Sequence, residues 1–193
     1  SAIASDVREG PLSRARATAR ACGCFERMSF RLCDGLSGIA PEEVDALVIA
    51  GMGGETIANI LEAAPWVKEK DFPIILQPMS TQAELRGWLW RNGFLCLREK
   101  TVLEGETLYS IILARQGGAV PMTPAEEWAG RQYPGMEDPL RGLLLDHLLG
   151  RVRRALDGMA RSRAPAEARR RELEQVLEGL MEMRKEWDAW QQR

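Results

Sequence analysis

The chain has 193 residues, of which 45% are hydrophobic and 28% are charged, and its 26 basic and 28 acidic side chains give a formal charge of −2. This composition is typical of a globular protein and excludes a disordered chain, a collagen-like chain and a small disulfide scaffold. The length predicts one domain with an appendage. A net charge near zero argues against a protein that coats nucleic acid indiscriminately, although a local basic patch remains possible.

We expect neither a membrane span nor a secretion signal in this chain. No run approaches the roughly 18–20 apolar residues that cross a bilayer, and the first six residues lack a basic region followed by an apolar one. We therefore expect a cytoplasmic protein with no membrane partner. Four cysteines, Cys22, Cys24, Cys33 and Cys96, accompany the single histidine His147 and form no C-x-x-C motif. We expect ordinary thiols and no metal site.

Apolar runs and amphipathic stretches alternate up to about residue 115, a pattern typical of helices packed on a parallel sheet. In chain order we predict strands at 2–5, 29–32, 46–50 and 73–76, and helices at 12–22, 55–62 and 82–91. Every residue from Ala46 to Ala50 is apolar, which predicts a strand covered on both faces. A short connection joins segments 94–99 and 107–115, so we predict that they form an antiparallel pair at the sheet edge.

The pattern changes after Gly118. Asp138-Pro139 predicts a helix start, because aspartate suits the N-cap and proline the first helical position. Apolar residues then recur at alternating steps of three and four, in two sets separated by a turn at 162–165. We predict an antiparallel coiled-coil hairpin, with an α/β domain at 1–120 and a helical domain at 121–193. The two sets are Leu145, Leu149, Val152, Leu156 and Met159, and Leu173, Val176, Leu180, Met183, Trp187 and Trp190.

Arginines gather in the predicted hairpin. Residues 141–171 contain nine arginines against three acidic residues, so this segment carries a charge of +6. The planar guanidinium suits phosphate oxygens and stacks on bases, which favours an RNA-phosphate surface. A solvated helical face is the alternative interpretation. The nine are Arg141, Arg151, Arg153, Arg154, Arg161, Arg163, Arg169, Arg170 and Arg171.

Residues suited to ligand binding follow four successive predicted strands, and in open α/β sheets ligands bind at the carboxyl ends of strands. Asp6 could accept the hydroxyls of a ribose, and Asp34-Gly35 could bind an adenine edge and let the ring approach the backbone. The 51–54 glycine segment opens a helix, and Gln77-Pro78 offers an amide beside a rigid turn. A helix cap or a tight turn explains each feature alone, whereas their joint placement predicts one nucleoside-like cofactor. No phosphate-binding G-x-x-x-x-G-K-[ST] loop is present, so ATP or GTP hydrolysis is disfavoured.

Several of these segments resemble one bacterial family, the S-adenosylmethionine-dependent tRNA adenine-N1 methyltransferases that modify adenine 22. The resemblance runs from residue 2 to about residue 115. It implies an α/β class I methyltransferase sheet of the Rossmann-like type followed by a C-terminal coiled-coil hairpin, with S-adenosyl-L-methionine as cofactor and tRNA as partner. A monomer is expected. The segments that carry the resemblance are A-S-D-V at 4–7, D-G-L at 34–36, I-A-G-M-G-G at 49–54, L-Q-P at 76–78 and L-R-x-W-L at 85–89.

The resemblance also implies roles for individual residues. Asp6 is expected at the ribose and Asp34 and Gly35 at the adenine of the cofactor, with the glycine segment between cofactor and target base. No residue is identified as a catalytic acid or base. The cofactor-binding candidates are Asp6, Val7, Asp34, Gly35, Leu36, Ala50 and Gly51; the target-pocket candidates are Met52, Gly53, Gly54, Gln77 and Pro78; and the RNA-binding candidates are Arg151, Arg153, Arg154, Arg161, Arg163, Arg169, Arg170 and Arg171.

One departure from the family pattern concerns the beginning of the chain. The family begins with a further strand and a G-[TS]-D-H-[AG]-Y-L-P loop that cradles the methionine part of the cofactor. Here the chain opens at what corresponds to the second strand, and the missing strand would lie between those at 2–5 and 46–50, where its absence leaves backbone groups unpaired. We therefore expect an N-terminally truncated chain.

Two other functions remain open. The first is a methyltransferase that acts on another RNA or on a small molecule. The second is a non-catalytic interaction module, in which the helix bearing Trp187 and Trp190 docks a partner.

Overall fold

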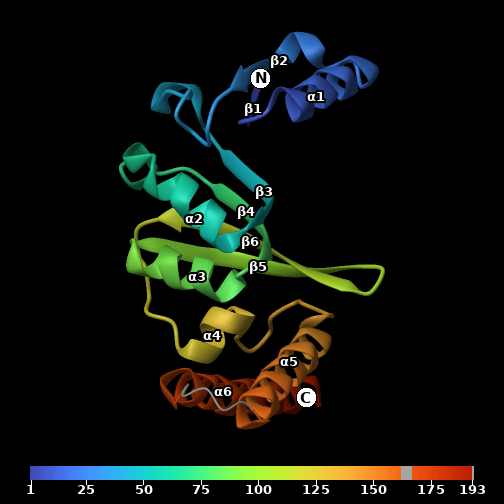
Figure 1. The fold of residues 1–193 in the computed structure, drawn as a ribbon, viewed down its shortest axis with the longest axis vertical. Coiled ribbons are helices and arrows are strands. Elements are labelled where there is room, and N and C mark those ends of the chain that lie inside the picture. Colours follow the sequence, from blue (N-terminus) through green and yellow to red (C-terminus); the bar gives the residue numbers. More distant parts are fainter. Residues whose placement is uncertain (162–166, 193) are drawn as a thin grey trace.

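The structure is a computed structural model that describes residues 1–161 and 167–192. Figure 1 shows an N-terminal α/β unit at one end of the long axis, a four-stranded sheet with two helices in the middle, and a helical part at the other end. The predicted turn at 162–165 and the predicted RNA-binding residue Arg163 lie outside the described residues. No helix in the described ranges is long and apolar enough to cross a membrane.

The N-terminal unit is a strand–helix–strand motif. β1 (Ala2–Asp6) and β2 (Met28–Leu32) form a two-stranded parallel sheet, and α1 (Glu9–Ala21) connects them. α1 buries Leu12 and Ala19, which lie seven positions apart and therefore on one side of the helix. The predicted parallel arrangement is confirmed here, with the helix beginning three residues earlier than the 12–22 prediction.

The second sheet has the strand order β3-β4-β6-β5. β3 and β4 are parallel, whereas β6 is antiparallel to both β4 and β5, which confirms the predicted antiparallel pair at the sheet edge. β5 continues beyond the predicted residue 99, so the two strands extend as a ribbon away from the sheet (Figure 1). The strands are β3 (Leu47–Gly53), β4 (Ile74–Ser80), β5 (Phe94–Glu104) and β6 (Thr107–Gln116).

Helices α2 (Gly54–Glu62) and α3 (Gln82–Arg91) pack on one face of this sheet and enclose its apolar core. The prediction that the third strand is covered on both faces is wrong for the described residues. Val48 is 64% exposed and Ile75, opposite it on β4, is 37% exposed, because no described element covers that face. The connections also contain short 3-10 helices at Phe25–Arg27, Pro41–Glu43 and Pro65–Lys68.

The helical part contains α4 (Pro124–Ala129), α5 (Arg141–Arg161) and α6 (Glu167–Gln191). Gly142, near the start of α5, lies beside Trp187, near the end of α6, so these two helices run antiparallel. Their apolar residues form one buried cluster together with α4, as the three-and-four spacing predicts. The buried seam residues are Leu145, Leu149, Val152, Leu173, Val176, Leu180, Met183 and Trp187, with Leu156, Met159 and Trp190 partly buried beside them.

Two details of this part differ from the sequence prediction. α5 begins at Arg141 rather than at 138, because Asp138 caps a turn by accepting the N–H of Leu140 at 3.1 Å. The helix α4 was not predicted. Thr123 and Glu126 form a capping box that starts it, and this is a signal that the sequence carries.

Candidate functional site

A β-bulge at Gly51 shapes the carboxyl end of β3. Ala50 is opposite Gln77 and Met52 is opposite Pro78, so Gly51 is the extra residue of its strand. Its φ of +76° lies in the left-handed region that favours glycine. The side chain of Gln77 compensates for the disrupted ladder, because its Oε1 accepts the Gly51 N–H at 2.9 Å.

The sequence placed the glycine segment and Gln77-Pro78 after their strands, and this placement is wrong. β3 continues through Gly53 and β4 through Ser80, because the two strands keep pairing beyond the bulge. Gly51, Met52 and Gly53 are therefore the last residues of β3, Gly54 begins α2, and Gln77 and Pro78 lie inside β4. This makes their positions more rigid than loop positions would be.

Bare backbone faces open space at the bulge. A Cβ added to Gly51 would meet no heavy atom within 4 Å. Gln77 is held in place beside it, since its Nε2 lies 3.3 Å from the carbonyl oxygen of Pro78 and 3.4 Å from the sulfur of Met79. A flat ligand could approach the main chain closely here, as cofactor rings do in sites built from glycine.

The start of α2 packs tightly against the start of α3. A Cβ on Gly54 would lie 2.2 Å from the carbonyl oxygen of Thr81, so only glycine fits. Thr81 itself has a φ of 49°, which is strained for a β-branched residue, and its Oγ1 accepts the N–H of Glu55 at 3.2 Å. Thr81 is not among the predicted site residues; threonine just before a helix often caps it, but the Thr81 side chain forms no cap hydrogen bond with α3.

The carboxyl end of β1 and the loop after β2 lie together. Ser5 Oγ donates to the carbonyl oxygen of Gly35 at 3.3 Å, and Asp6 Oδ1 accepts the N–H of Arg8 at 2.8 Å. Gly35 has a φ of +54°, and a Cβ there would lie 3.0 Å from the side chain of Ile60 on α2. The Gly35 turn therefore packs on the helix that the glycine segment begins, which links the predicted adenine-side residues to the bulge.

The remaining cofactor candidates differ in exposure. Asp34 and Val7 are exposed, and so are Ala50 and Met52. Leu36 is buried in the core of the second sheet, and it anchors the adjacent Gly35 turn to that core. The structure thus gathers the candidates around two places, the Asp6–Gly35 contact and the Gly51 bulge.

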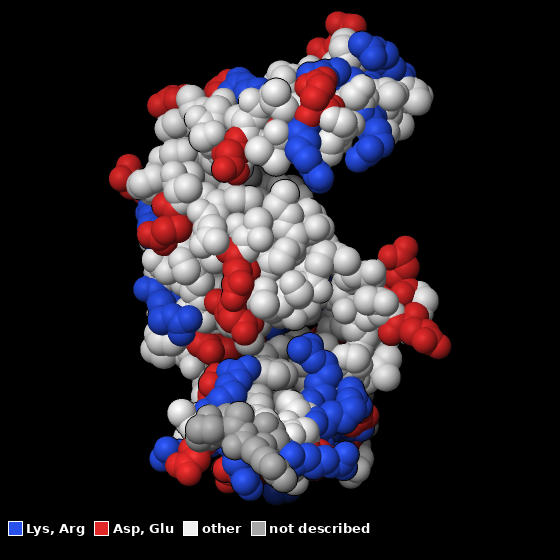
Figure 2. Space-filling model, in the orientation of Figure 1, with Lys and Arg blue, Asp and Glu red and all other residues white. Residues whose placement is uncertain are grey.

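The predicted RNA-binding arginines that the structure describes lie on α5 and α6, where Figure 2 shows Lys and Arg side chains gathered at one end of the molecule. Arg169 and Arg170 form ion pairs with Glu172 at 2.7 Å and Glu174 at 2.9 Å. The guanidinium of Arg151 stacks over the ring of Trp128 at 5.5 Å. The predicted arginines of this surface therefore differ in whether their guanidinium groups already contact a carboxylate or an aromatic ring.

One arginine that the sequence counted in the +6 segment does not belong to this surface. Arg141 is 2% exposed, because its side chain turns inward and donates to the carbonyl oxygens of Ala129 and Gly130. Arg141 therefore adds no exposed charge to segment 141–171, although the sequence count of +6 includes it.

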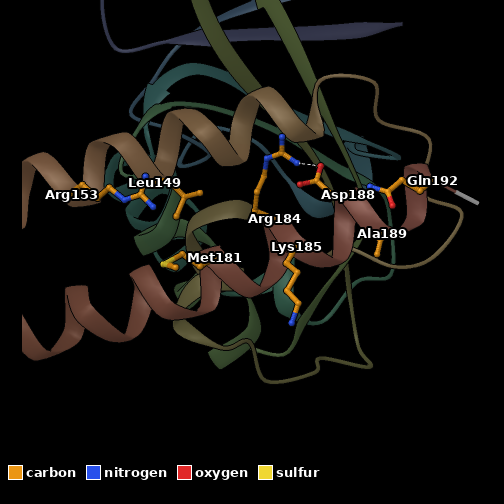
Figure 3. Close-up of a pocket in the computed structure, with 8 residues that line it drawn as sticks. All are labelled: Leu149, Arg153, Met181, Arg184, Lys185, Asp188, Ala189 and Gln192. Atoms are coloured by element: carbon orange, nitrogen blue, oxygen red, sulfur yellow. Dashed lines mark hydrogen bonds and ion pairs between the residues drawn. The ribbon is translucent and has the colours of Figure 1, made fainter.

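A groove of about 480 Å³ runs along the outside of the two long helices (Figure 3). Arg153 and Lys185 contribute cations to it, and Met181 contributes apolar surface. Arg184, at the centre of the close-up, pairs with Asp146 at 2.8 Å and with Asp188, so its charge is already compensated. The groove is lined only by residues of α5, α6 and the adjoining Gln192, away from the strand ends.

Comparison with known proteins shows that this chain is similar to methyltransferases. A family described as methyltransferase domain matches residues 1–112. A curated relative from Bacillus subtilis, named tRNA (adenine(22)-N(1))-methyltransferase, is 34% identical over 116 residues, which cover 60% of this chain and 49% of the relative. The match thus spans about half the length of that relative.

Solved structures are similar over nearly the whole chain. A proposed tRNA (m1A22) methyltransferase of Streptococcus pneumoniae has a TM-score of 0.79 and 27% identity, with 95% of this chain and 82% of that chain covered. The same protein in complex with S-adenosyl-L-methionine has a TM-score of 0.78 at 27% identity, with 95% and 81% covered. A protein of the NADB-Rossmann superfamily from Streptococcus agalactiae has a TM-score of 0.77 at 25% identity, with 94% and 79% covered. The sheet and helices described above are thus a Rossmann-like α/β fold.

Proposed function

This chain belongs to the methyltransferase-domain family, and from that premise we propose that it transfers the methyl group of S-adenosylmethionine to N1 of adenine 22 of a tRNA. The relationship to the Bacillus subtilis and Streptococcus pneumoniae proteins supports this substrate. The observation on the molecule that carries the proposal is the Gly51 bulge, where open backbone and a fixed amide lie together at the ends of two parallel strands.

The residues present fit S-adenosylmethionine. The Asp6 carboxylate at the end of β1 suits the two hydroxyls of a ribose, and the exposed Asp34 suits an exocyclic amine. Gly35 and Gly51 both have positive φ and bring backbone, rather than side chains, to the surface that an adenine ring would meet. Within this arrangement the cofactor supplies a methyl group carried on a positively charged sulfur.

The proposed reaction needs little acid–base chemistry from the protein. N1 of neutral adenine has a lone pair and no proton, so a bond from N1 to the methyl carbon forms as the carbon–sulfur bond breaks, and the positive charge passes to the base. The chain must hold the adenine in line and offer a polar surface to the new cation. Gln77 suits this role, because Oε1 accepts from Gly51 and thereby fixes the amide at the strand end. N1 lies on the pairing edge, so the adenine must be unpaired or turned out of its stack before it reacts.

We also propose that a further strand completes the sheet between β1 and β3. Within the described residues, β1 pairs only with β2, and β3 pairs only with β4 on one side. The apolar face around Val48 and Ile75 is exposed beside this gap. A strand at this position would align the Asp6 and Gly51 ends in one row of carboxyl ends, as the sequence resemblance implies.

For the organisation of the chain, we propose a boundary near residue 120 and a C-terminal coiled-coil hairpin. The buried residues of one apolar core run from Leu36 to Ala114 and those of the other from Ala125 to Trp187, with Leu108 of β6 partly buried against the second. The buried seam of α5 and α6 at steps of three and four residues supports the coiled coil.

We expect Gln77→Ala to weaken cofactor binding. The substitution removes the acceptor for the Gly51 N–H, so the free energy of unfolding should fall by about 1 kcal/mol and the Kd for S-adenosylmethionine should rise about five-fold. Urea denaturation and calorimetric titration measure the two effects. Gln77→Glu keeps an acceptor oxygen at this position, and it should retain the stability that Gln77→Ala loses. Equal losses in both variants would contradict the role of the hydrogen bond.

The structure also ranks the arginines proposed to bind RNA. Among the described residues, no carboxylate lies within ion-pair distance of Arg153 or Arg154, whereas Arg169 and Arg170 already pair with glutamates. The double variant Arg153→Gln/Arg154→Gln should therefore lose more tRNA affinity than Arg169→Gln/Arg170→Gln. For this variant, the slope of log affinity against log salt concentration should become less negative by about 1 for each phosphate that is no longer neutralised.

Filter binding across a salt series measures both double variants, and calorimetry checks that the Kd for S-adenosylmethionine stays unchanged. Equal losses from the two pairs would overturn the ranking. Unchanged tRNA affinity in both would overturn the assignment of these arginines to RNA.

Calorimetric titration of the gene product with S-adenosylmethionine tests the enzyme class itself. Binding at one site per chain is expected. Absence of binding would favour the interaction module that the sequence left open. Binding without methyl transfer to tRNA would favour a methyltransferase with another substrate.

A further inference from the structure

The short helix α4 ends between two buried arginines that come from different parts of the chain. Arg86 of α3 is 1% exposed, and its Nη1 donates to the carbonyl oxygens of Glu127 and Trp128 at 2.9 Å each. The last carbonyls of a helix have no partner within the helix. Arg86 therefore satisfies two of them from the side of the sheet.

Arg141 satisfies the next two carbonyls from the side of the long helices. Its Nη1 donates to Ala129, and its Nη2 donates to Gly130 at 2.8 Å. Burial lowers the pKa of Arg141 to about 10, so its guanidinium stays protonated at neutral pH. Four consecutive carbonyls thus accept from two cations, one from each part of the molecule.

Arg86, Arg141 and the end of α4 form a junction between the sheet and the helical part. Two carboxylates also belong to this junction, one on β5 and one before α5. Glu99 of β5 forms a bidentate pair with Arg86, with Nη2 to Oε2 at 2.8 Å. Thr101 of the same strand donates to Asp138 Oδ2 at 2.7 Å, and both of these residues are buried. Asp138 caps the turn that leads into α5, so β5 contacts the turn directly before that helix.

The backbone here leaves no room for larger residues. A Cβ on Gly130 would lie 2.7 Å from both carboxylate oxygens of Glu99, and Gly130 has a φ of +74°. Beyond it, Gln132 donates to the carbonyl oxygen of Met183 on α6 at 2.8 Å. The same loop therefore contacts the sheet, α5 and α6.

From this junction we infer that Arg86 and Arg141 act as a clamp on the end of α4, which fixes the orientation of the α5–α6 hairpin relative to the sheet. The inference rests on the proposed function in one respect: it makes both arginines positioning residues that hold the RNA-binding surface at a fixed place relative to the Gly51 bulge. Neither side chain is available to touch tRNA, because both are buried. A buried, fully hydrogen-bonded network suits this role, since its geometry has one arrangement that satisfies all members.

The clamp also explains why Arg151 lies where it does. Trp128 of α4 stacks under its guanidinium at 5.5 Å, and the backbone of Trp128 is held by Arg86. The orientation of one predicted RNA-binding side chain thus depends on the clamp through a single residue.

The test compares Arg141→Lys with Arg184→Lys. Lysine keeps the charge but lacks the fork that reaches two carbonyls. Arg184 is the control, because its guanidinium pairs with Asp146 on α5 and Asp188 on α6 and, among the described residues, forms no hydrogen bond with α4 or with the sheet. Spin labels on non-canonical residues at positions 59 and 182, both exposed, report the distance between α2 and α6 without labelling the cysteines.

We expect a narrow distance distribution in the parent protein and in Arg184→Lys, and a broadened or shifted one in Arg141→Lys. The loosened hairpin still binds phosphates but presents the adenine less often. The tRNA KM and the Kd for S-adenosylmethionine should therefore change less than two-fold, while kcat, normalised to the sites that bind cofactor, should fall about ten-fold or more.

Thr101→Val keeps the test informative where Arg141→Lys does not fold, because it removes a single hydrogen bond from the junction. It should broaden the distances in the same sense. Unchanged distances in both variants, or a kcat that falls no further than in Arg184→Lys, would overturn the clamp. A parent protein that transfers no methyl group to tRNA would overturn the proposed function instead, and the distance measurement would still decide the clamp.

Discussion

Gly54→Ala is expected to reduce methyl transfer about 100-fold, the scale of effect that follows a displacement of about 1 Å at a site that works by alignment. The added methyl group would lie 2.2 Å from the carbonyl oxygen of Thr81 and 3.0 Å from the Cβ of Leu85. Neither is the end of a flexible side chain, so the start of α2 must move away from α3. The glycine segment moves with it, because Gly53 and Gly54 join β3 directly to α2.

The same substitution should lower the free energy of unfolding by about 1–3 kcal/mol, as inserting a group into a packed site does. Two other glycines complete the series, and Gly10 is its control. Gly51→Ala meets no atom within 4 Å but adopts a φ of +76°, so it should cost about 1 kcal/mol through backbone strain alone. Gly10→Ala, in the first turn of α1, meets no atom within 4 Å and has no positive φ, so it should be neutral or slightly stabilising.

Urea denaturation and initial rates of methyl transfer measure this series. The expected order of damage to the rate is Gly54, then Gly51, with Gly10 unaffected. A Gly54→Ala protein as active as Gly10→Ala would show that the close packing of α2 on Thr81 does not position the site.

Arg86→Met should produce the largest loss of stability. Arg86 is almost fully buried and forms three hydrogen bonds to Glu99, besides those to α4. Its removal leaves the largely buried Glu99 carboxylate without its counter-ion, a change that typically costs about 3–5 kcal/mol. That is a large fraction of the roughly 5–15 kcal/mol by which a domain is stable.

Arg91→Met, on the same helix, is the control for this prediction. Arg91 pairs with Glu127 at 3.2 Å but is 54% exposed, so its loss should cost about 1 kcal/mol or less. The double variant Arg86→Met/Glu99→Leu should recover part of the loss, because it replaces a buried pair by apolar groups instead of leaving one charge alone. Equal stabilities of Arg86→Met and Arg91→Met in denaturant titrations would contradict the energetic role of the buried pair.

The sequence predicts the elements that repeat a local pattern. The strands of both sheets and the helices α1, α2 and α3 follow from apolar runs and amphipathic spacing, because burial of one face is recorded in every few residues. The seam of α5 and α6 is predicted residue by residue for the same reason. The predicted resemblance to a methyltransferase is confirmed at the level of the family.

The parts that the sequence does not predict depend on contacts between distant residues. Arg86 is 13 positions from Glu99 and more than 40 from the carbonyl of Glu127 that it also meets, so no local spacing indicates the clamp. The sequence count includes Arg141 in the surface charge because arginine side chains are rarely fully buried, and only the contact with the end of α4 shows that this one is. The sequence predicts a loop at Gly51 instead of a bulge, because continued pairing beyond it depends on the partner strand.

The predicted site residues lie at or near strand ends, although β3 and β4 end later than predicted. Asp6 is the last residue of β1, Gly35 follows β2 and Gly51 lies near the end of β3, whereas Gln77 lies inside β4 and contacts Gly51 through its side chain. Thr81 escapes a sequence-based prediction because both of its contacts, the hydrogen bond from Glu55 and the packing of its carbonyl oxygen on Gly54, join segments more than 20 residues apart.

Transfer of a labelled methyl group to matched tRNA transcripts with adenine or guanine at position 22 tests the proposed function most directly. The gene product should label the adenine transcript at N1 of residue 22 and leave the guanine transcript unlabelled. Equal labelling of both transcripts, or no labelling of the adenine transcript by protein that binds S-adenosylmethionine, would contradict the proposal.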